Sequence, residues 1–146
     1  MDALRGSLSS TRPAYDGRFY RYGGVVVDPC AVQPHVPIWV GGRTMRSLRR
    51  AVRSADGWMP FGLTVAQLCG MLSRVEVPAG FEVVLATGRS VDPLAEPVAT
   101  AARLATLRDA GATVITCSVS ADSADHYVEQ LAALRDIADR LEGEAG

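Results

Sequence analysis

The rhythm of hydrophobic and polar positions changes at about residue 38. From there to residue 141, short apolar runs alternate with longer segments whose apolar residues recur at helical spacing. The apolar runs at residues 38–40, 56–60, 81–86 and 113–116 predict four strands. Short apolar strands that alternate with amphipathic helices are typical of a parallel sheet covered by those helices. The sequence therefore predicts an α/β fold built from four strand–helix units.

Each predicted helix has an apolar face that would pack on the sheet. Thr64 is a suitable N-cap for the second helix, Pro97 suits the first turn of the third, and Gly111 suits its end. The fourth helix spans about residues 125–141. The predicted inward-facing residues are Leu48, Ala51, Val52 and Ala55 in the first helix, Val65, Leu68 and Leu72 in the second, Val98, Ala101, Ala102 and Ala105 in the third, and Tyr127, Leu131, Leu134, Ala138 and Leu141 in the fourth.

Four such units fit two architectures. They could form a small open α/β sheet, or they could form half of a TIM-type (β/α)8 barrel, which needs about 250 residues when complete. In both cases the crossovers between parallel strands are expected to be right-handed. Spacing and composition alone leave this choice open.

The part of the chain before residue 38 has a different character. Residues 1–15 are mostly polar and small, and we expect them to be loosely ordered, with residues 16–146 forming the domain. The β-prone runs 18–22 and 25–27 flank Gly23 and Gly24, which predicts a β-hairpin with a two-residue turn. Three prolines within residues 28–37 predict an extended, Pro-rich connector.

Composition narrows the class of protein. The 146 residues suit one domain, and a net charge of −1 gives no field that would recruit nucleic acid or an anionic membrane. We expect a cytoplasmic protein, because no apolar run reaches membrane-span length and the first residues lack a signal-peptide core. The odd number of widely spaced cysteines predicts reduced thiols and no metal site. All basic residues are arginine, which excludes lysine-based Schiff-base and Walker chemistry.

The junctions that follow the strands are where ligands of parallel α/β proteins bind. The most informative junction is residues 40–44, where Gly41 and Gly42 lead directly into a helix. Glycines let an anion approach the backbone, and the free amides of the first helical turn attract it. Arg43 and Arg46 lie in or beside that turn, where an anion would offset their conflict with the helix dipole. The alternative is a simple tight turn followed by a solvated arginine face.

The other three junctions carry weaker signals. Residues 58–62 are apolar and aromatic, so they could wall a flat ring or simply belong to the core. Residues 87–90 supply a hydroxyl, a flexible glycine and a cation. Residues 117–120 contain Cys117, which has no base beside it in the sequence. We find no triad, no carboxylate pair and no base-reading motif, so no catalytic residue is assigned.

Five segments together resemble the luciferase-like monooxygenase family: residues 17–20, 25–29, 37–44, 47–51 and 55–60. The sequence is most similar to actinobacterial flavin- or deazaflavin-dependent oxidoreductases. The resemblance implies an eight-stranded barrel, of which residues 38–40 are the fifth strand and the four units are the C-terminal half. It also implies FMN or the deazaflavin coenzyme F-420 as cofactor. The residues it places at the phosphate end are Gly41, Gly42, Arg43 and Thr44, with Trp58 and Pro60 beside them.

The first four strands of that family's barrel have no counterpart here, which leaves three functional hypotheses. The chain could be an oxidoreductase that positions a flavin-type ring against a small-molecule substrate. It could instead be a truncated, non-catalytic half-barrel that dimerises or only binds a phosphorylated ligand. An unrelated open-sheet binding domain is the third hypothesis. Under the barrel hypotheses we expect a homo-oligomer or a partner that completes the barrel, because open sheet edges promote association.

Overall fold

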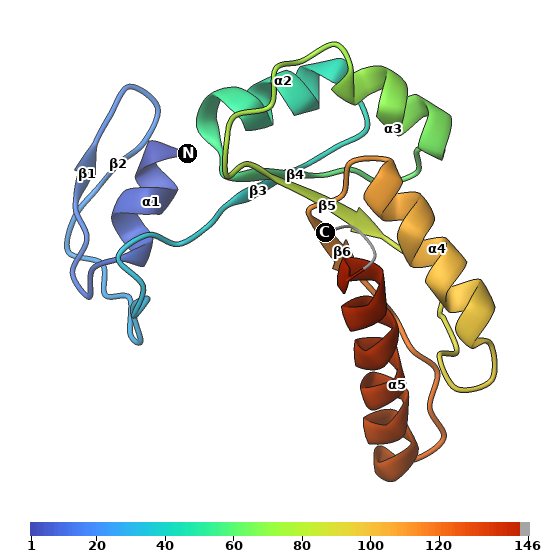
Figure 1. Cartoon of the computed structure of the whole chain (residues 1–146). Helices are drawn as coiled ribbons and strands as arrows, with labels where there is room; N and C mark the ends of the chain where they lie inside the picture. Colours follow the sequence, from blue (N-terminus) through green and yellow to red (C-terminus); the bar gives the residue numbers. More distant parts are fainter. Residues whose placement is uncertain (144–146) are drawn as a thin grey trace.

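The computed structural model describes residues 1–143, and its centre is a four-stranded parallel sheet (Figure 1). The strands follow one another in space in the order of the sequence, with all neighbours parallel. They are β3 (Trp39–Gly41), β4 (Gly57–Met59), β5 (Glu82–Ala86) and β6 (Val114–Thr116), and the helices after them are α2 (Met45–Ser54), α3 (Val65–Leu72), α4 (Pro97–Asp109) and α5 (Ala124–Gly143).

The strand order decides between the two architectures. An open doubly wound sheet reverses its strand order at a switch point, whereas here the order β3-β4-β5-β6 is strictly sequential. Sequential right-handed crossovers place every helix on the same side of the sheet, and α2, α3, α4 and α5 follow one another around its outer side (Figure 1). The expected half of a TIM-type barrel is therefore confirmed.

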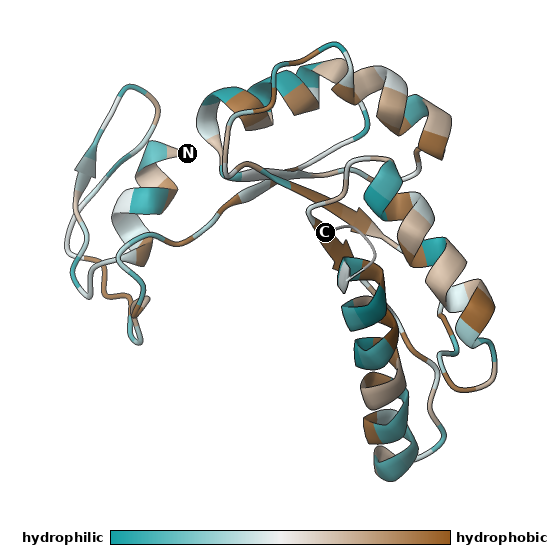
Figure 2. Cartoon of the chain, in the orientation of Figure 1, coloured by the Kyte–Doolittle hydropathy of each residue, from teal (hydrophilic) through white to brown (hydrophobic). Residues whose placement is uncertain are grey.

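The core lies between the sheet and the helices. Alternate strand residues such as Val40, Trp58 and Val83 face the helices, where they meet the fully buried Leu48 of α2 and Leu68 of α3. The predominantly brown colour of β5 and β6 shows how apolar these strands are (Figure 2). Burying one such leucine contributes about 1.5–3 kcal/mol, so this layer dominates the stability of the domain.

The predicted helix ends are largely confirmed. Thr64 caps α3 through a reciprocal capping box with Gln67, and Pro97 occupies the first turn of α4. Gly111 follows the C-cap of α4 with a φ of +100°, a conformation that favours glycine.

The predicted inner face of α4 is wrong. Val98 is 82% exposed, and the buried residues of the helix are Thr100, Leu104 and Leu107. Alanines and one valine offer little apolar area, so the larger leucines decide which face packs. In α5, Leu134, Ala138 and Leu141 are partly buried as predicted, whereas Tyr127 and Leu131 are exposed.

The hairpin is present at a different position from the predicted one. Strands β1 (Tyr15–Asp16) and β2 (Arg21–Tyr22) pair antiparallel, so the turn lies at residues 17–20 and residues 25–27 form no strand. Tyr15 stacks on Tyr22 with ring centroids 5.9 Å apart, and Asp16 accepts a 2.8 Å hydrogen bond from Arg21. These cross-strand pairs outweigh the turn signal of the two glycines that follow.

Residues 1–15, expected to be loosely ordered, contain the helix α1 (Asp2–Leu8). Arg5 of α1 forms a 2.7 Å ion pair with Asp56, and Met1 packs against the hydrophobic core. These long-range contacts hold the segment, and sequence spacing gives no sign of them. Residues 28–37 form no helix or strand, which confirms the connector. Within residues 1–143, no helix has the length and apolarity needed to cross a membrane.

Candidate functional site

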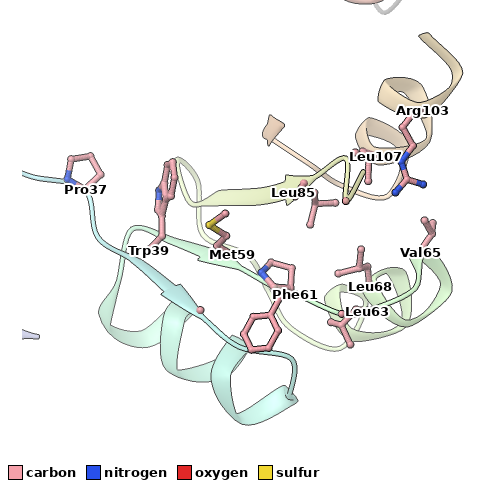
Figure 3. Close-up of a pocket in the computed structure, with 15 residues that line it drawn as sticks. Pro37, Trp39, Met59, Phe61, Leu63, Val65, Leu68, Leu85, Arg103 and Leu107 are labelled. Atoms are coloured by element: carbon pink, nitrogen blue, oxygen red, sulfur yellow. The ribbon is translucent and has the colours of Figure 1, made fainter. Parts of the chain in front are cut away.

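A large apolar cavity lies where β3, β4 and β5 lead into their helices (Figure 3). Its volume is about 810 Å³, and it extends from the exposed face of the sheet to the first turn of α3 and the middle of α4. Most of its walls are apolar side chains and glycine backbone. The lining residues are Pro37, Trp39, Gly41, Met59, Pro60, Phe61, Gly62, Leu63, Val65, Leu68, Leu85, Ala86, Gly88, Arg103 and Leu107.

Trp39 forms one wall of the cavity and is held by contacts to the two neighbouring strands. Its indole Nε1 donates a 2.6 Å hydrogen bond to Oε2 of Glu82 on β5. The Trp39 side chain passes over Gly57 of β4, where an added Cβ would lie only 2.7 Å from Trp39 Cδ1. Glycine at position 57 therefore makes room for the indole, which stays 40% exposed towards the cavity.

The junction after β4 supplies the next wall of the cavity. Successive side chains of the strand point to opposite faces of the sheet, so only some of these residues face the cavity. Met59 and Phe61 are exposed on the cavity side, and Pro60 is buried but still lines the cavity as the resemblance implied. Trp58 lies on the opposite side of the strand, with an exposed fraction of 0%. It cannot contact a ligand in this structure, so the expectation that Trp58 borders the cofactor is wrong.

Trp58 instead supports the first junction from behind. Its Nε1 donates a 3.3 Å hydrogen bond to Oγ of Ser47 in α2. The same Oγ accepts a bond from the Thr44 amide at 3.2 Å and donates to the Thr44 carbonyl at 2.7 Å. Ser47 thus connects the buried tryptophan to the turn that contains the two glycines.

The structure requires glycine at only one of the two glycine positions in this turn. Gly42 has a φ of +140°, and an added Cβ would lie 2.6 Å from Cβ of Ser47, so the turn itself requires glycine there. Gly41 has no positive φ, and the nearest atom to an added Cβ is the Met59 carbonyl oxygen at 3.9 Å. Packing and backbone conformation therefore permit a side chain at position 41, which would project into the cavity.

The amides at the start of α2 are partly available to a ligand. Thr44 caps the helix by accepting from the Ser47 amide at 3.2 Å, so the amides of Thr44 and Ser47 are already paired. The amides of Met45 and Arg46 have no hydrogen-bond partner among residues 1–143. The side chains of Arg43 and Arg46 are exposed, and Arg46 borders a groove with the other arginines of α2. The turn can therefore offer two amides and two guanidinium groups to an anion.

The junction after β5 does not supply the cation of the cavity, although its sequence contains an arginine. Thr87 is buried and its hydroxyl donates to the Arg89 carbonyl at 3.0 Å, while Arg89 does not line the cavity. The cation at the cavity is Arg103 of α4, which donates two hydrogen bonds of 2.8 and 3.2 Å to the Thr87 carbonyl. Gly88, with a φ of +80°, exposes backbone to the cavity between them.

The junction after β6 lies away from this site. Cys117 is half-buried, and burial raises the pKa of its thiol. It lines a separate cavity of about 410 Å³ between α4, β6 and α5. All three cysteines are free thiols, and residues 1–143 contain no cluster of three or more His, Cys, Asp or Glu side chains that could hold a metal ion.

Sequence reasoning missed Trp39 and Arg103, whereas Met59 and Phe61 belong to the junction at residues 58–62 that it offered as a possible wall for a flat ring. A signal for Trp39 exists, because a strand residue that alternates with the buried Val40 must face the other side of the sheet. Arg103 carries no such signal, since it reaches the junction after β5 from the second turn of a helix.

Comparison with known proteins gives one family and several mycobacterial relatives. The family model for luciferase-like monooxygenases matches residues 1–79. The uncharacterized protein Rv0953c of Mycobacterium tuberculosis is 31% identical over 140 residues, which cover 91% of this chain and 48% of that protein, and Mb0978c of Mycobacterium bovis matches equally. Rv0940c of Mycobacterium tuberculosis is 36% identical over 76 residues, covering 52% of this chain and 26% of that protein. The chain spans about half the length of the curated relatives that it matches over most of its own sequence.

Proposed function

The chain belongs to the luciferase-like monooxygenase family, and from this premise we propose that it is the cofactor-holding half of a flavin- or deazaflavin-dependent oxidoreductase. The family relationship supports a flavin-type cofactor, and the choice between FMN and coenzyme F-420 is part of the experiment below. The three free thiols suit a reducing compartment, so we also propose a cytoplasmic location.

The cavity fits the ring system of such a cofactor. Its volume of about 810 Å³ lies within the roughly 300–1,000 Å³ typical of small-molecule sites, which are mostly apolar. Trp39 offers an aromatic face that Glu82 holds in place, and Met59 and Phe61 add apolar surface. These side chains can hold a flat conjugated ring and exclude water from it.

The observation that carries the proposal is Gly41. Neither backbone conformation nor packing requires glycine at this position, yet any larger side chain would fill the cavity beside the start of α2. Met45 and Arg46, whose amides are free, begin the helix that follows this turn, and the guanidinium groups of Arg43 and Arg46 are exposed, although none of these residues lines the cavity itself. A phosphate attached to the ring's side chain would find this combination of open backbone and positive charge favourable.

The bound cofactor would supply hydride transfer or oxygen activation, and the residues of this chain would bind and orient it. Among the described residues that line the cavity, Arg103 is the one titratable side chain, and it is engaged with the Thr87 carbonyl. The cavity walls thus offer no carboxylate or histidine to move a proton. This favours the second candidate, a half-barrel that binds a phosphorylated cofactor without turning it over.

Cofactor binding is tested with Gly41→Val, because valine suits a strand and the fold has room for it. The purified chain is titrated separately with FMN and coenzyme F-420, and binding is followed by the cofactor's own fluorescence. We expect micromolar affinity for one cofactor and at least a tenfold loss in the variant, with an unchanged melting temperature. Gly70→Ala in α3 is the matched control, since nothing lies within 4 Å of its added Cβ and Gly70 does not line the cavity.

The outcomes separate the two candidates. Reduction of the bound cofactor by a hydride donor at a rate above that of the free cofactor supports the oxidoreductase. Binding without such acceleration supports the binding-only half-barrel. If neither cofactor binds, or if Gly41→Val binds as tightly as the wild type, the proposed cofactor site is wrong.

A further inference from the structure

Arg103 is a cation without a counter-charge in the wall of the candidate site. Every other described residue that lines the cavity is uncharged. No ion pair within residues 1–143 includes Arg103, and the positions three and four residues away from it on α4 carry no acidic side chain. The cavity therefore has one positive charge that the described part of the chain does not neutralise.

Two hydrogen bonds fix the orientation of this guanidinium group and leave one of its edges free. Nε and Nη2 donate to the Thr87 carbonyl at 3.2 and 2.8 Å. These bonds occupy the side edge of the planar group. The end edge, formed by Nη1 and the second N–H of Nη2, has no partner in the part of the chain that the structure describes. It is a fork of two N–H groups, which matches the two oxygens of a carboxylate.

The end of the cavity at Arg103 is apolar apart from this group. Figure 3 shows the Arg103 side chain extending from α4, with Leu107 of the same helix and Val65 of α3 lining the same end of the cavity. Trp39 lines the opposite end, and Met59 lies between the two ends (Figure 3). A molecule that extends from Arg103 towards Trp39 therefore meets apolar side chains along its length and a cation at its end.

The elements around Arg103 lie in the middle of the sheet and of the helix layer. β4 and β5 each pair with a strand on both sides, and α4 lies between α3 and α5 (Figure 1). The position of Arg103 is thus set by residues of this chain. It does not depend on what lies beyond either edge of the sheet.

We propose that Arg103 binds the carboxylate of the substrate, and that the substrate is an organic acid with an apolar body. This inference rests on the proposed function, because it assigns a substrate class to the same cavity. The start of α2 takes the phosphate of the cofactor, and Arg103 takes one negative charge at the other end. The guanidinium supplies the specificity, since a lysine would keep the charge but not the fork.

The experiment titrates the full chain with octanoate and with octanol, an uncharged molecule of the same chain length, by isothermal titration calorimetry at pH 7. We expect Arg103→Met to lower the affinity for octanoate at least about tenfold and to leave the affinity for octanol unchanged. Arg103→Lys should lose an intermediate amount, because it keeps the charge without the fork. Arg89→Met is the matched control, since Arg89 follows the same strand but does not line the cavity. It should bind octanoate as the wild type does.

The other outcomes overturn the proposal. A wild-type chain that does not bind octanoate has no such site. Arg103→Met that binds octanoate as tightly as the wild type shows that the guanidinium is not the contact. Equal losses of octanoate and octanol show that Arg103 only supports the cavity through the Thr87 carbonyl. Circular dichroism checks the folding of each variant, and Arg103→Lys carries the test if Arg103→Met does not fold.

The cofactor titrations separate this inference from the proposed function. Arg103→Met should bind FMN or coenzyme F-420 with wild-type affinity, and a loss of cofactor affinity alone would assign Arg103 to the cofactor and overturn the proposal. If octanoate binding depends on Arg103 but neither cofactor binds, the carboxylate site stands and the cofactor site is wrong. If a cofactor binds and octanoate does not, only the carboxylate site is wrong.

Discussion

Asp56 joins three separate parts of the chain at the amino end of β4. Its Oδ2 accepts hydrogen bonds of 2.7 Å from both the Arg5 guanidinium and the Ile38 amide, and its Oδ1 lies 2.8 Å from Nε2 of His35. It therefore connects α1 and the connector to the sheet. We predict that Asp56→Asn destabilises the folded chain, because the amide cannot pair with the charge of Arg5.

The size of the effect follows from the pKa of Asp56. Partial burial alone would raise this pKa, but the hydrogen bonds from Ile38, Arg5 and His35 together lower it from 3.8 to about 2. A shift of this size corresponds to about 2.4 kcal/mol. Because 26% of the side chain is exposed and solvent screens the ion pair, we expect a loss of about 1–2 kcal/mol at pH 7.

The pH dependence gives a second signature of the same carboxylate. Since its pKa is lower in the folded state, Asp56 stabilises the fold above about pH 4, and this contribution is lost as the pH falls towards 2. Urea denaturation followed by circular dichroism at several pH values measures it. The difference between wild type and Asp56→Asn should shrink by most of its value between about pH 5 and pH 2. A difference that is negligible at pH 7, or that stays constant down to pH 2, would refute this reasoning.

Four further substitutions, each followed by urea denaturation, test the cap of α3, the buried face of α4 and the support that Trp58 gives to the junction after β3. Thr64→Ala removes the capping box of α3 and should cost about 1 kcal/mol, whereas no loss would show that the cap is unimportant. Leu104→Ala should cost about 2–4 kcal/mol and Val98→Ala less than about 0.5 kcal/mol, and equal losses would contradict the buried face of α4. Trp58→Phe removes the bond to Ser47, so we expect a loss of about 1–2 kcal/mol and weaker binding in the titration used for Gly41→Val; unchanged binding would show that Trp58 does not support the junction.

The strand–helix units were predictable because their signals are local. Apolar runs of three to six residues, helical spacing, and the caps at Thr64 and Gly111 all act within one or two turns of chain. The half-barrel followed once the resemblance was added, since spacing alone leaves the open sheet as an alternative. The position of Gly41 and Gly42 at a strand–helix junction was equally local.

The errors arose where distant contacts decide the structure. The hairpin is set by Tyr15 stacking on Tyr22, and two adjacent glycines cannot reveal that pairing. Trp58 was placed at the ligand because its type and position suit a ring contact, but the side of the strand it occupies depends on the sheet's pleat. The α1 helix is held by Asp56, fifty-one residues away from Arg5.

The chain has two tryptophans, and they lie on opposite faces of the sheet. Trp58 is enclosed in the hydrophobic core, and Trp39 is open to the cavity. Intrinsic emission should accordingly contain a blue-shifted component that reports unfolding and a red-shifted, quencher-accessible component that reports events at the cavity. Acrylamide quenching can separate the two, so the protein carries its own optical probes for folding and for ligand entry without any label.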